Sequence, residues 1–324
     1  MKLSASTSAS SSAVTEICAT SGTLACLVMT TTNLGQLRTI GGEQLRVQVA
    51  NPGPTQVAIV FVNGMGVSLD YWDPVVELLP EFTCIRFDRP GMGGSPDSGW
   101  DSTDIRTEVD RIFRVADDEV GPRCPLVLVG HSYGGIIAET AARLEPQRTM
   151  GLVLVDGTDP LQHANDDTRL EAVLAPALAL ASSIPGFAST LGGAVERIAT
   201  FATTVNPDGP RLTPEQRSLV SSRTHVRNLL REDLRIPHHC RQALEIARSA
   251  PLPPIPVTLL VSSEERTLMG TRRASDWISR NFKRVGQFGE LAKLQILRAG
   301  HLMMFDEPVA VAAAITDVAE GGPR

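Results

Sequence analysis

The chain has 324 residues, of which 42% are hydrophobic and 20% are charged, and its formal net charge is −6. These proportions are typical of a globular protein and leave room for one large α/β domain with an insertion. Cations and anions are interspersed, so we expect no nucleic-acid partner. No run approaches the roughly 18 apolar residues that would span a membrane, so we expect no membrane partner either. The five cysteines lie far apart without CxxC spacing, which favours reduced thiols over a disulfide framework or a zinc site.

The first 33 residues are rich in Ser, Thr and Ala and show little periodicity. Lys2 is the only early cation, and the best apolar run, Leu24–Met29, is shorter than the about 7–15 residues of a secretory signal. We therefore expect a disordered leader over residues 1–33 and a cytoplasmic protein, with export as the alternative.

Strands and helices are predicted to alternate in the next part of the chain. Residues 37–49 alternate apolar and polar side chains around Gly41-Gly42, which is typical of an antiparallel hairpin at a sheet edge. Four apolar runs have the character of strands buried on both faces: 56–62, 82–88, 126–129 and 151–156. Three segments between them are expected to be helices: 72–79, 104–116 and 136–144. This alternation predicts right-handed crossovers and a mostly parallel sheet.

The alternation stops between residues 159 and 250, where the sequence is largely helical and has no convincing strand. One helix start is well marked, with Thr213 as cap, Pro214 in the first turn and Gln216 three residues after the cap. The alternation then resumes with two strands and two helices: 253–261, 272–285, 292–297 and 307–318. We therefore predict a core of residues 34–158 and 251–324, with residues 159–250 as a helical lid inserted after the sixth strand.

The segment Gly130-His131-Ser132-Tyr133-Gly134 follows a buried strand and precedes a helix, which puts Ser132 at the apex of a sharp turn. A nucleophile on so tight a turn leaves no room for a Cβ two residues before or after it, and glycine occupies both places. The pattern therefore predicts that Ser132 is a nucleophile. A serine hydroxyl is a poor nucleophile at its own pKa, so it requires an adjacent base.

The order of elements resembles the α/β-hydrolase superfamily from about Leu37 to the end of the chain. Four motifs carry the resemblance, in the family's order: Asn63-Gly-Met-Gly66, Arg86-Phe-Asp-Arg-Pro-Gly-Met-Gly-Gly-Ser95, Gly130–Gly134 and Ala299-Gly-His301. The resemblance implies an α/β-hydrolase fold in which Ser132 is the nucleophile and His301 the general base. It also implies an oxyanion hole made by the backbone N–H groups of Met65 and Tyr133.

Three residues are candidates for the acid that orients His301. The family usually places an Asp after its seventh strand in a Gly-x-x-Asp pattern. Here Ser262 stands in place of the glycine and Glu265 in place of the Asp. Some members use an acid after the sixth strand instead, which in this chain is Asp156. We expect Glu265 first, Asp156 second and Glu264 third, and Asp156 could equally cap backbone N–H groups at its strand end.

The remaining histidines are predicted to have packing or surface roles. His131 is expected to point away from the chemistry, although it neighbours the nucleophile. His238, His239 and Cys240 are possible metal ligands in a row, but adjacent residues rarely converge on one ion. The prediction is that the protein holds neither a metal nor another cofactor.

The resemblance implies a serine hydrolase that cleaves a carboxylic ester or related acyl bond of a small, fairly apolar substrate through an acyl-enzyme. Family members that use Asp (haloalkane dehalogenases, epoxide hydrolases) or Cys (dienelactone hydrolases) at the turn are set apart by Ser132. Lactonase, amidase, carbon–carbon bond hydrolase, hydroxynitrile lyase and cofactor-free peroxidase activities remain alternatives, as does a non-catalytic ligand binder. Apolar residues between 174 and 191 could line the substrate pocket or pack the lid. The oligomeric state is left open.

Overall fold

A computed structural model describes residues 34–98, 104–166, 190, 200, 203–206, 208–267 and 270–321, without the side chains of residues 265–273. The predicted leader lies outside the described residues, and so do the apolar positions from 174 to 187 together with Leu191. The structure is therefore described from Leu34 onward.

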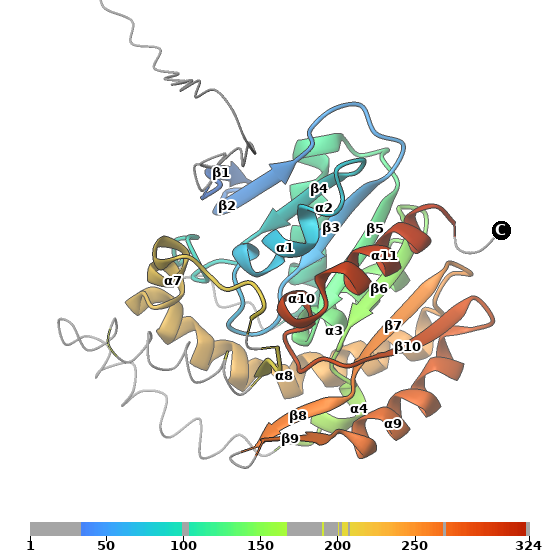
Figure 1. The fold of residues 1–324 in the computed structure, drawn as a ribbon. Helices are drawn as coiled ribbons and strands as arrows, with labels where there is room; N and C mark the ends of the chain where they lie inside the picture. Colours follow the sequence, from blue (N-terminus) through green and yellow to red (C-terminus); the bar gives the residue numbers. More distant parts are fainter. Residues whose placement is uncertain are drawn as a thin grey trace, which may run out of the picture. The chain divides into compact units, whose positions relative to one another are not determined.

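Eight strands form one sheet in the order β1-β2-β4-β3-β5-β6-β7-β10 (Figure 1). Their bounds are β1 Gln36–Ile40, β2 Glu43–Ala50, β3 Ala58–Val62, β4 Thr83–Phe87, β5 Leu126–His131, β6 Thr149–Val155, β7 Val257–Ser262 and β10 Ala292–Leu297. β2 is antiparallel to β1 and β4, and all other neighbours are parallel. The mostly parallel sheet is thus confirmed, and the carboxyl ends of six parallel strands meet at one edge, where ligand sites of open α/β sheets lie.

Helices cover both faces of this sheet (Figure 1). Their bounds are η1 Leu69–Trp72, α1 Asp73–Val76, α2 Ile105–Val120, α3 Tyr133–Leu144, α4 Pro160–His163, α7 Pro214–Val220, α8 Arg223–Ser249, α9 Ser275–Val285, η2 Gly286–Phe288, α10 Met303–Asp306 and α11 Pro308–Ala319. In β5, Leu126 and Leu128 pack in the same core as α2, α3, α8 and α9, whereas Val127 and Val129 pack with α1, α10 and α11. Both faces of the strand are buried, which explains its uninterrupted apolar sequence.

The segment between β6 and β7, residues 159–250, is called the insert below. Within its described residues the ordered elements are helical: α4, α7 and α8, with single helical positions elsewhere. The predicted start of α7 is confirmed as a capping box. The Thr213 hydroxyl accepts from the Gln216 N–H (3.3 Å), and the Gln216 side chain accepts from the Thr213 N–H (2.9 Å).

The strands β8 (Glu264–Thr267) and β9 (Gly270–Arg273) were not predicted from the sequence. After β7 they form a two-stranded antiparallel hairpin. The helix expected from residue 272 therefore begins only at Ser275. This hairpin contains Glu265, the first choice for the triad acid.

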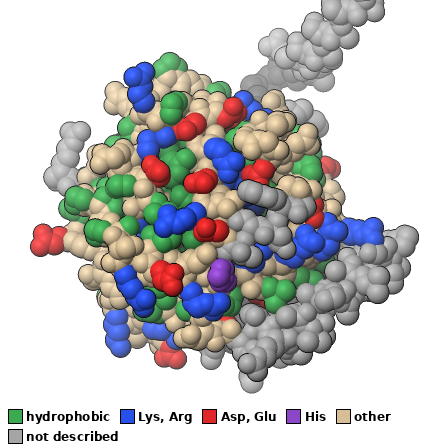
Figure 2. Space-filling view, turned by 180° about the vertical axis from the view of Figure 1, so that it is seen from behind, with side chains coloured by type: hydrophobic (Ala, Val, Ile, Leu, Met, Phe, Trp, Pro, Cys, Tyr) green, Lys and Arg blue, Asp and Glu red, His purple; other side chains and the backbone are tan. Residues whose placement is uncertain are grey.

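Charged side chains of both signs are mixed on the face shown in Figure 2, with apolar side chains between them. Where the structure is described, no helix combines the length and apolar character needed to cross a bilayer.

Gly134→Ala tests how closely α3 packs on β3. A Cβ at Gly134 would lie 2.5 Å from the Asn63 carbonyl oxygen and would also meet the Val62 carbonyl. We expect a loss of more than about 4 kcal/mol in the free energy of unfolding. The clash is between the added Cβ on α3 and the backbone carbonyls at the end of β3, so no side chain can move aside to relieve it. Gly286→Ala is the control, because its added Cβ meets nothing within 4 Å and its φ is −63°. Melting followed by circular dichroism should show the control near wild type, and an equally stable Gly134→Ala would refute this packing.

Candidate active site

Ser132 occupies the turn between β5 and α3 with φ 52° and ψ −125°, a backbone conformation that residues other than glycine rarely adopt. The chain reverses so closely that a Cβ on Gly130 would lie 2.6 Å from the Gly134 carbonyl oxygen. The predicted need for glycine at both positions is therefore confirmed. Strain of this kind persists only where surrounding structure imposes it, and it directs the Ser132 hydroxyl out of the sheet edge.

The loop after β3 lies against Ser132. A Cβ added to Gly64 would lie 3.1 Å from the Cβ of Ser132, which places the next peptide, Gly64–Met65, beside the serine. Tyr133 is the first residue of α3, so its N–H has no acceptor within the helix. The two residues whose N–H groups were predicted as donors, Met65 and Tyr133, therefore belong to segments that adjoin Ser132, and Tyr133 lies at the positive end of the α3 dipole.

His301 bridges the serine and an acid. Its Nε2 lies 3.0 Å from the Ser132 Oγ, and its Nδ1 lies 2.6 Å from Oδ2 of Asp156. A carboxylate accepts, so Nδ1 carries the hydrogen and Nε2 is left to accept from the serine hydroxyl. The structure therefore brings together the two residues expected to be nucleophile and base.

Asp156 follows β6 with φ 45° and is 4% exposed. Besides His301, its carboxylate accepts from the Ser262 N–H and hydroxyl (both 3.0 Å) and from Trp277 Nε1 (2.6 Å). Burial alone would raise the pKa of this carboxyl, but the hydrogen bonds and the proximity of His301 hold the pKa of Asp156 below its usual value. The acid is thus ionised and fully hydrogen-bonded at neutral pH.

The geometry favours Asp156 over Glu265, our first choice. In the backbone register of the β8–β9 hairpin Glu265 lies opposite Arg272, and Asp156 already occupies the Nδ1 side of His301. The carboxylate of Glu264, the third choice, lies 3.5 Å from Nε of Arg298. We therefore replace Glu265 by Asp156 in the proposal below, because the chain turns into a hairpin where the family pattern would place its acid.

His131 contacts His301, contrary to the expectation that it points away from the candidate site. Its Nε2 donates to the His301 carbonyl (3.0 Å), and the two rings are 4.7 Å apart. Burial, and next the neighbouring His301, lower the pKa of His131 to about 3. His131 is therefore a neutral donor that holds the backbone of the His301 loop.

Several residues that support the site have no sequence motif. Ser262 and Trp277 orient Asp156, and Asp306 accepts from the Gly300 N–H (2.8 Å), just before His301. Asp306 also accepts from the N–H groups of Val205 and Asn206, which ties the insert to the His301 loop. Ser262 is the last residue of β7 and Asp306 follows His301 by five residues, which are weak signals, and Trp277 within α9 carried none.

The run His238-His239-Cys240 does not converge on one point. His238 is exposed, Cys240 is buried in the core, and His239 Nδ1 is hydrogen-bonded to the Tyr133 hydroxyl (2.6 Å). In the part of the chain that the structure describes, no group of three or more His, Cys, Asp or Glu side chains is arranged to hold a metal ion.

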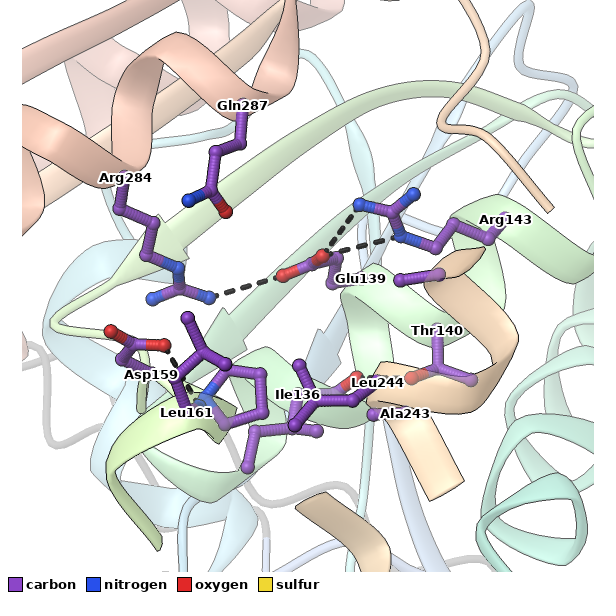
Figure 3. Close-up of a pocket in the computed structure, with 12 residues that line it drawn as sticks. Ile136, Glu139, Thr140, Arg143, Asp159, Leu161, Ala243, Leu244, Arg284 and Gln287 are labelled. Carbon is purple, nitrogen blue, oxygen red and sulfur yellow. Dashed lines mark hydrogen bonds and ion pairs between the residues drawn. The ribbon is translucent and has the colours of Figure 1, made fainter. Parts of the chain in front are cut away.

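A cavity of about 60 Å³ lies between α3, α8 and α9 (Figure 3). Glu139 sits in it between Arg143 and Arg284, and none of Ser132, Asp156 and His301 lines it. Ligand pockets usually measure about 300–1,000 Å³, so this cavity suits a few waters and not a substrate.

His131→Gln tests the neutral state of that histidine. Because the pKa of His131 is about 3 in the folded state, protons bind first to the unfolded chain, where the pKa is about 6.5. Its contribution to stability is therefore complete above pH 6.5 and declines as the pH falls towards 3. Between pH 7 and pH 5 the wild type should lose about 2 kcal/mol more than His131→Gln, measured by urea unfolding. Parallel stability curves would show that folding does not lower the pKa of His131.

The chain matches the alpha/beta hydrolase family over residues 59–314. It is 34% identical over 107 residues to the Bacillus subtilis protein YqjL, across 32% of this chain and 41% of that protein. It is 27% identical over 123 residues to a pimeloyl-(acyl-carrier protein) methyl ester esterase of Pseudoalteromonas atlantica, across 38% and 44% of the two chains. These matches span less than half of either relative.

Among solved structures, the ligand-free epoxide hydrolase CorEH superposes with a TM-score of 0.62 and 18% identity, over 88% of this chain and 98% of that one. At this identity the likeness concerns the fold alone. The family match covers most of the sheet and all of the motifs from Asn63 to His301. The chain belongs to the alpha/beta hydrolase family.

Proposed function

We propose that this protein is a serine hydrolase that cleaves a carboxylic ester or related acyl bond of a small, fairly apolar substrate. One observation carries the proposal: Ser132 Oγ, His301 and Asp156 are joined in sequence by contacts of 3.0 Å and 2.6 Å. An adjacent base oriented by a buried carboxylate is what a serine hydroxyl needs in order to attack a carbonyl.

In the proposed reaction, His301 Nε2 takes the Ser132 proton as Oγ attacks the substrate carbonyl. The N–H groups of Met65 and Tyr133 hold the oxyanion, and each such donor contributes a factor of about 10²–10³ to kcat. The imidazolium formed is stabilised by Asp156 and gives its proton to the leaving alcohol. A water molecule then gives a proton to His301 and attacks the acyl group. The bond to Ser132 Oγ breaks, the serine takes the proton back from His301, and the carboxylic acid is released.

An ester is preferred over other substrates on two grounds. One matched relative is named a methyl ester esterase, and the turn carries a serine and not the Asp of epoxide hydrolases of this fold. Lactones, amides and β-diketones need the same triad, so they belong in the same assay panel.

Labelling with a fluorophosphonate probe tests the nucleophile. We expect intact protein to gain one adduct, located on Ser132 by mass spectrometry, and to hydrolyse short p-nitrophenyl esters. Ser132→Ala should lose the adduct and lower kcat by about 10³-fold or more, because the covalent step is removed. Ser218→Ala, an exposed serine, is the control and should behave as wild type.

Folded wild-type protein that neither reacts with the probe nor turns over any compound of the panel would overturn the proposal. Turnover that survives in Ser132→Ala would do so as well.

A further inference from the structure

Helix α8 of the insert reaches the loop after β3 through one buried ion pair. Glu232 of α8 and Arg89, in the loop after β4, are 6% and 4% exposed. Arg89 Nε donates to Glu232 Oε1 (2.6 Å) and Arg89 Nη2 to Oε2 (2.9 Å), a bidentate pair. The Gly66 N–H also points at Glu232 Oε2, at 3.4 Å.

The other donors of Arg89 hold two carbonyls of the loop after β3. Nη1 donates to the Asn63 carbonyl (2.6 Å) and Nη2 to the Gly64 carbonyl (2.8 Å). The Gly64 carbonyl and the Met65 N–H belong to one planar trans peptide, so they point in opposite directions. An arginine fixed on that carbonyl therefore aims the Met65 N–H away from itself. Gly64, in the same peptide, lies against Ser132, because a Cβ added to Gly64 would come 3.1 Å from the Ser132 Cβ.

The same contact changes the strength of the donor. A cation on a peptide oxygen polarises the whole amide and makes its N–H a stronger hydrogen-bond donor, and burial enhances the effect. Glu232 balances the charge of Arg89 and fixes the plane of its guanidinium. Without this partner, a buried arginine would not hold the same orientation against the Gly64 carbonyl.

α8 packs on these loops at further points. The Gly93 N–H donates to His225 Nδ1 (2.9 Å), and a Cβ on Gly66 would lie 2.8 Å from Leu229 Cδ1. The position of α8 is thus transmitted to the loop by direct contact, and Glu232 is the contact that reaches the Gly64–Met65 peptide through Arg89.

We propose that Glu232 and Arg89 are positioning residues of the oxyanion hole, which couple the placement of the insert to the orientation and strength of the Met65 N–H donor. This inference rests on the proposed function, because it assigns a task to that N–H group. It gives the insert a role in positioning an oxyanion donor.

Two variants of the full-length protein test this positioning role. Glu232→Gln keeps the shape of the side chain but removes its charge, and Arg89→Lys keeps the charge but loses the bidentate guanidinium. We expect kcat for a p-nitrophenyl ester to fall about 10–100-fold in each, with KM within about twofold. The inhibition constant of a trifluoromethyl ketone, which forms a tetrahedral oxyanion on the serine, should rise by the same factor as kcat falls.

Glu43→Gln is the matched control. Glu43 is 7% exposed and forms a bidentate pair with Arg111 at 2.8 Å for both bonds, so this variant also breaks a buried ion pair. It should lower the melting temperature to a similar degree while kcat and the inhibition constant stay within about twofold of wild type.

Suppose that the wild type is active and the variants are folded. Equal kinetic losses in Glu43→Gln, or an unchanged kcat in Glu232→Gln or Arg89→Lys, would then overturn the proposed coupling but not the proposed function. Inactive wild-type protein would instead refute the proposed function. A crystal structure of wild type with the trifluoromethyl ketone gives a further test that needs no variant. The Met65 N–H should contact the oxyanion while Arg89 holds the Gly64 carbonyl, and a peptide turned away from Arg89 would refute the inference.

Discussion

The buried carboxylate of Asp156 is the interaction on which the site depends. An ionised group at 4% exposure is tolerated only when its oxygens are supplied with donors, and here the donors come from Ser262, Trp277 and His301. These residues belong to the end of β7, to α9 and to the loop after β10. Satisfying one charge therefore fixes three segments relative to the end of β6, and it leaves His301 with the tautomer that a general base requires.

Close backbone approach at the carboxyl edge of the sheet is the second constraint. Gly64, Gly130 and Gly134 each occupy a place where a Cβ would meet a neighbouring segment. Of the non-glycine residues that the structure describes, three have positive φ, and two of them are Ser132 and Asp156. The strained backbone thus coincides with the groups that the proposed chemistry uses, at the ends of adjacent strands β5 and β6.

The fold was predictable because its signals are local: apolar runs for buried strands, glycines for the tight turn, and a capping box at Thr213. The resemblance to α/β hydrolases implied that Ser132 and His301 lie together, since in that fold both loops lie at the carboxyl edge of the sheet. The sequence named Asp156 only as the second candidate acid, because a pattern after β7 cannot tell whether the chain goes on to place Glu265 near His301 or turns into the β8–β9 hairpin. The pairing of Arg89 with Glu232 could not be predicted, since 143 positions separate the two residues and no sequence motif contains both.

The central claim is that Asp156 is the carboxylate that orients His301. One-dimensional proton NMR in water tests it most directly, because it observes the proton between His301 Nδ1 and the carboxylate. A hydrogen bond from a buried imidazole to a carboxylate gives a resonance far downfield of the amide region. The account predicts this resonance in the wild type and in Glu265→Gln, and its loss in Asp156→Asn and His301→Gln. A resonance that persists in Asp156→Asn and disappears in Glu265→Gln would contradict it.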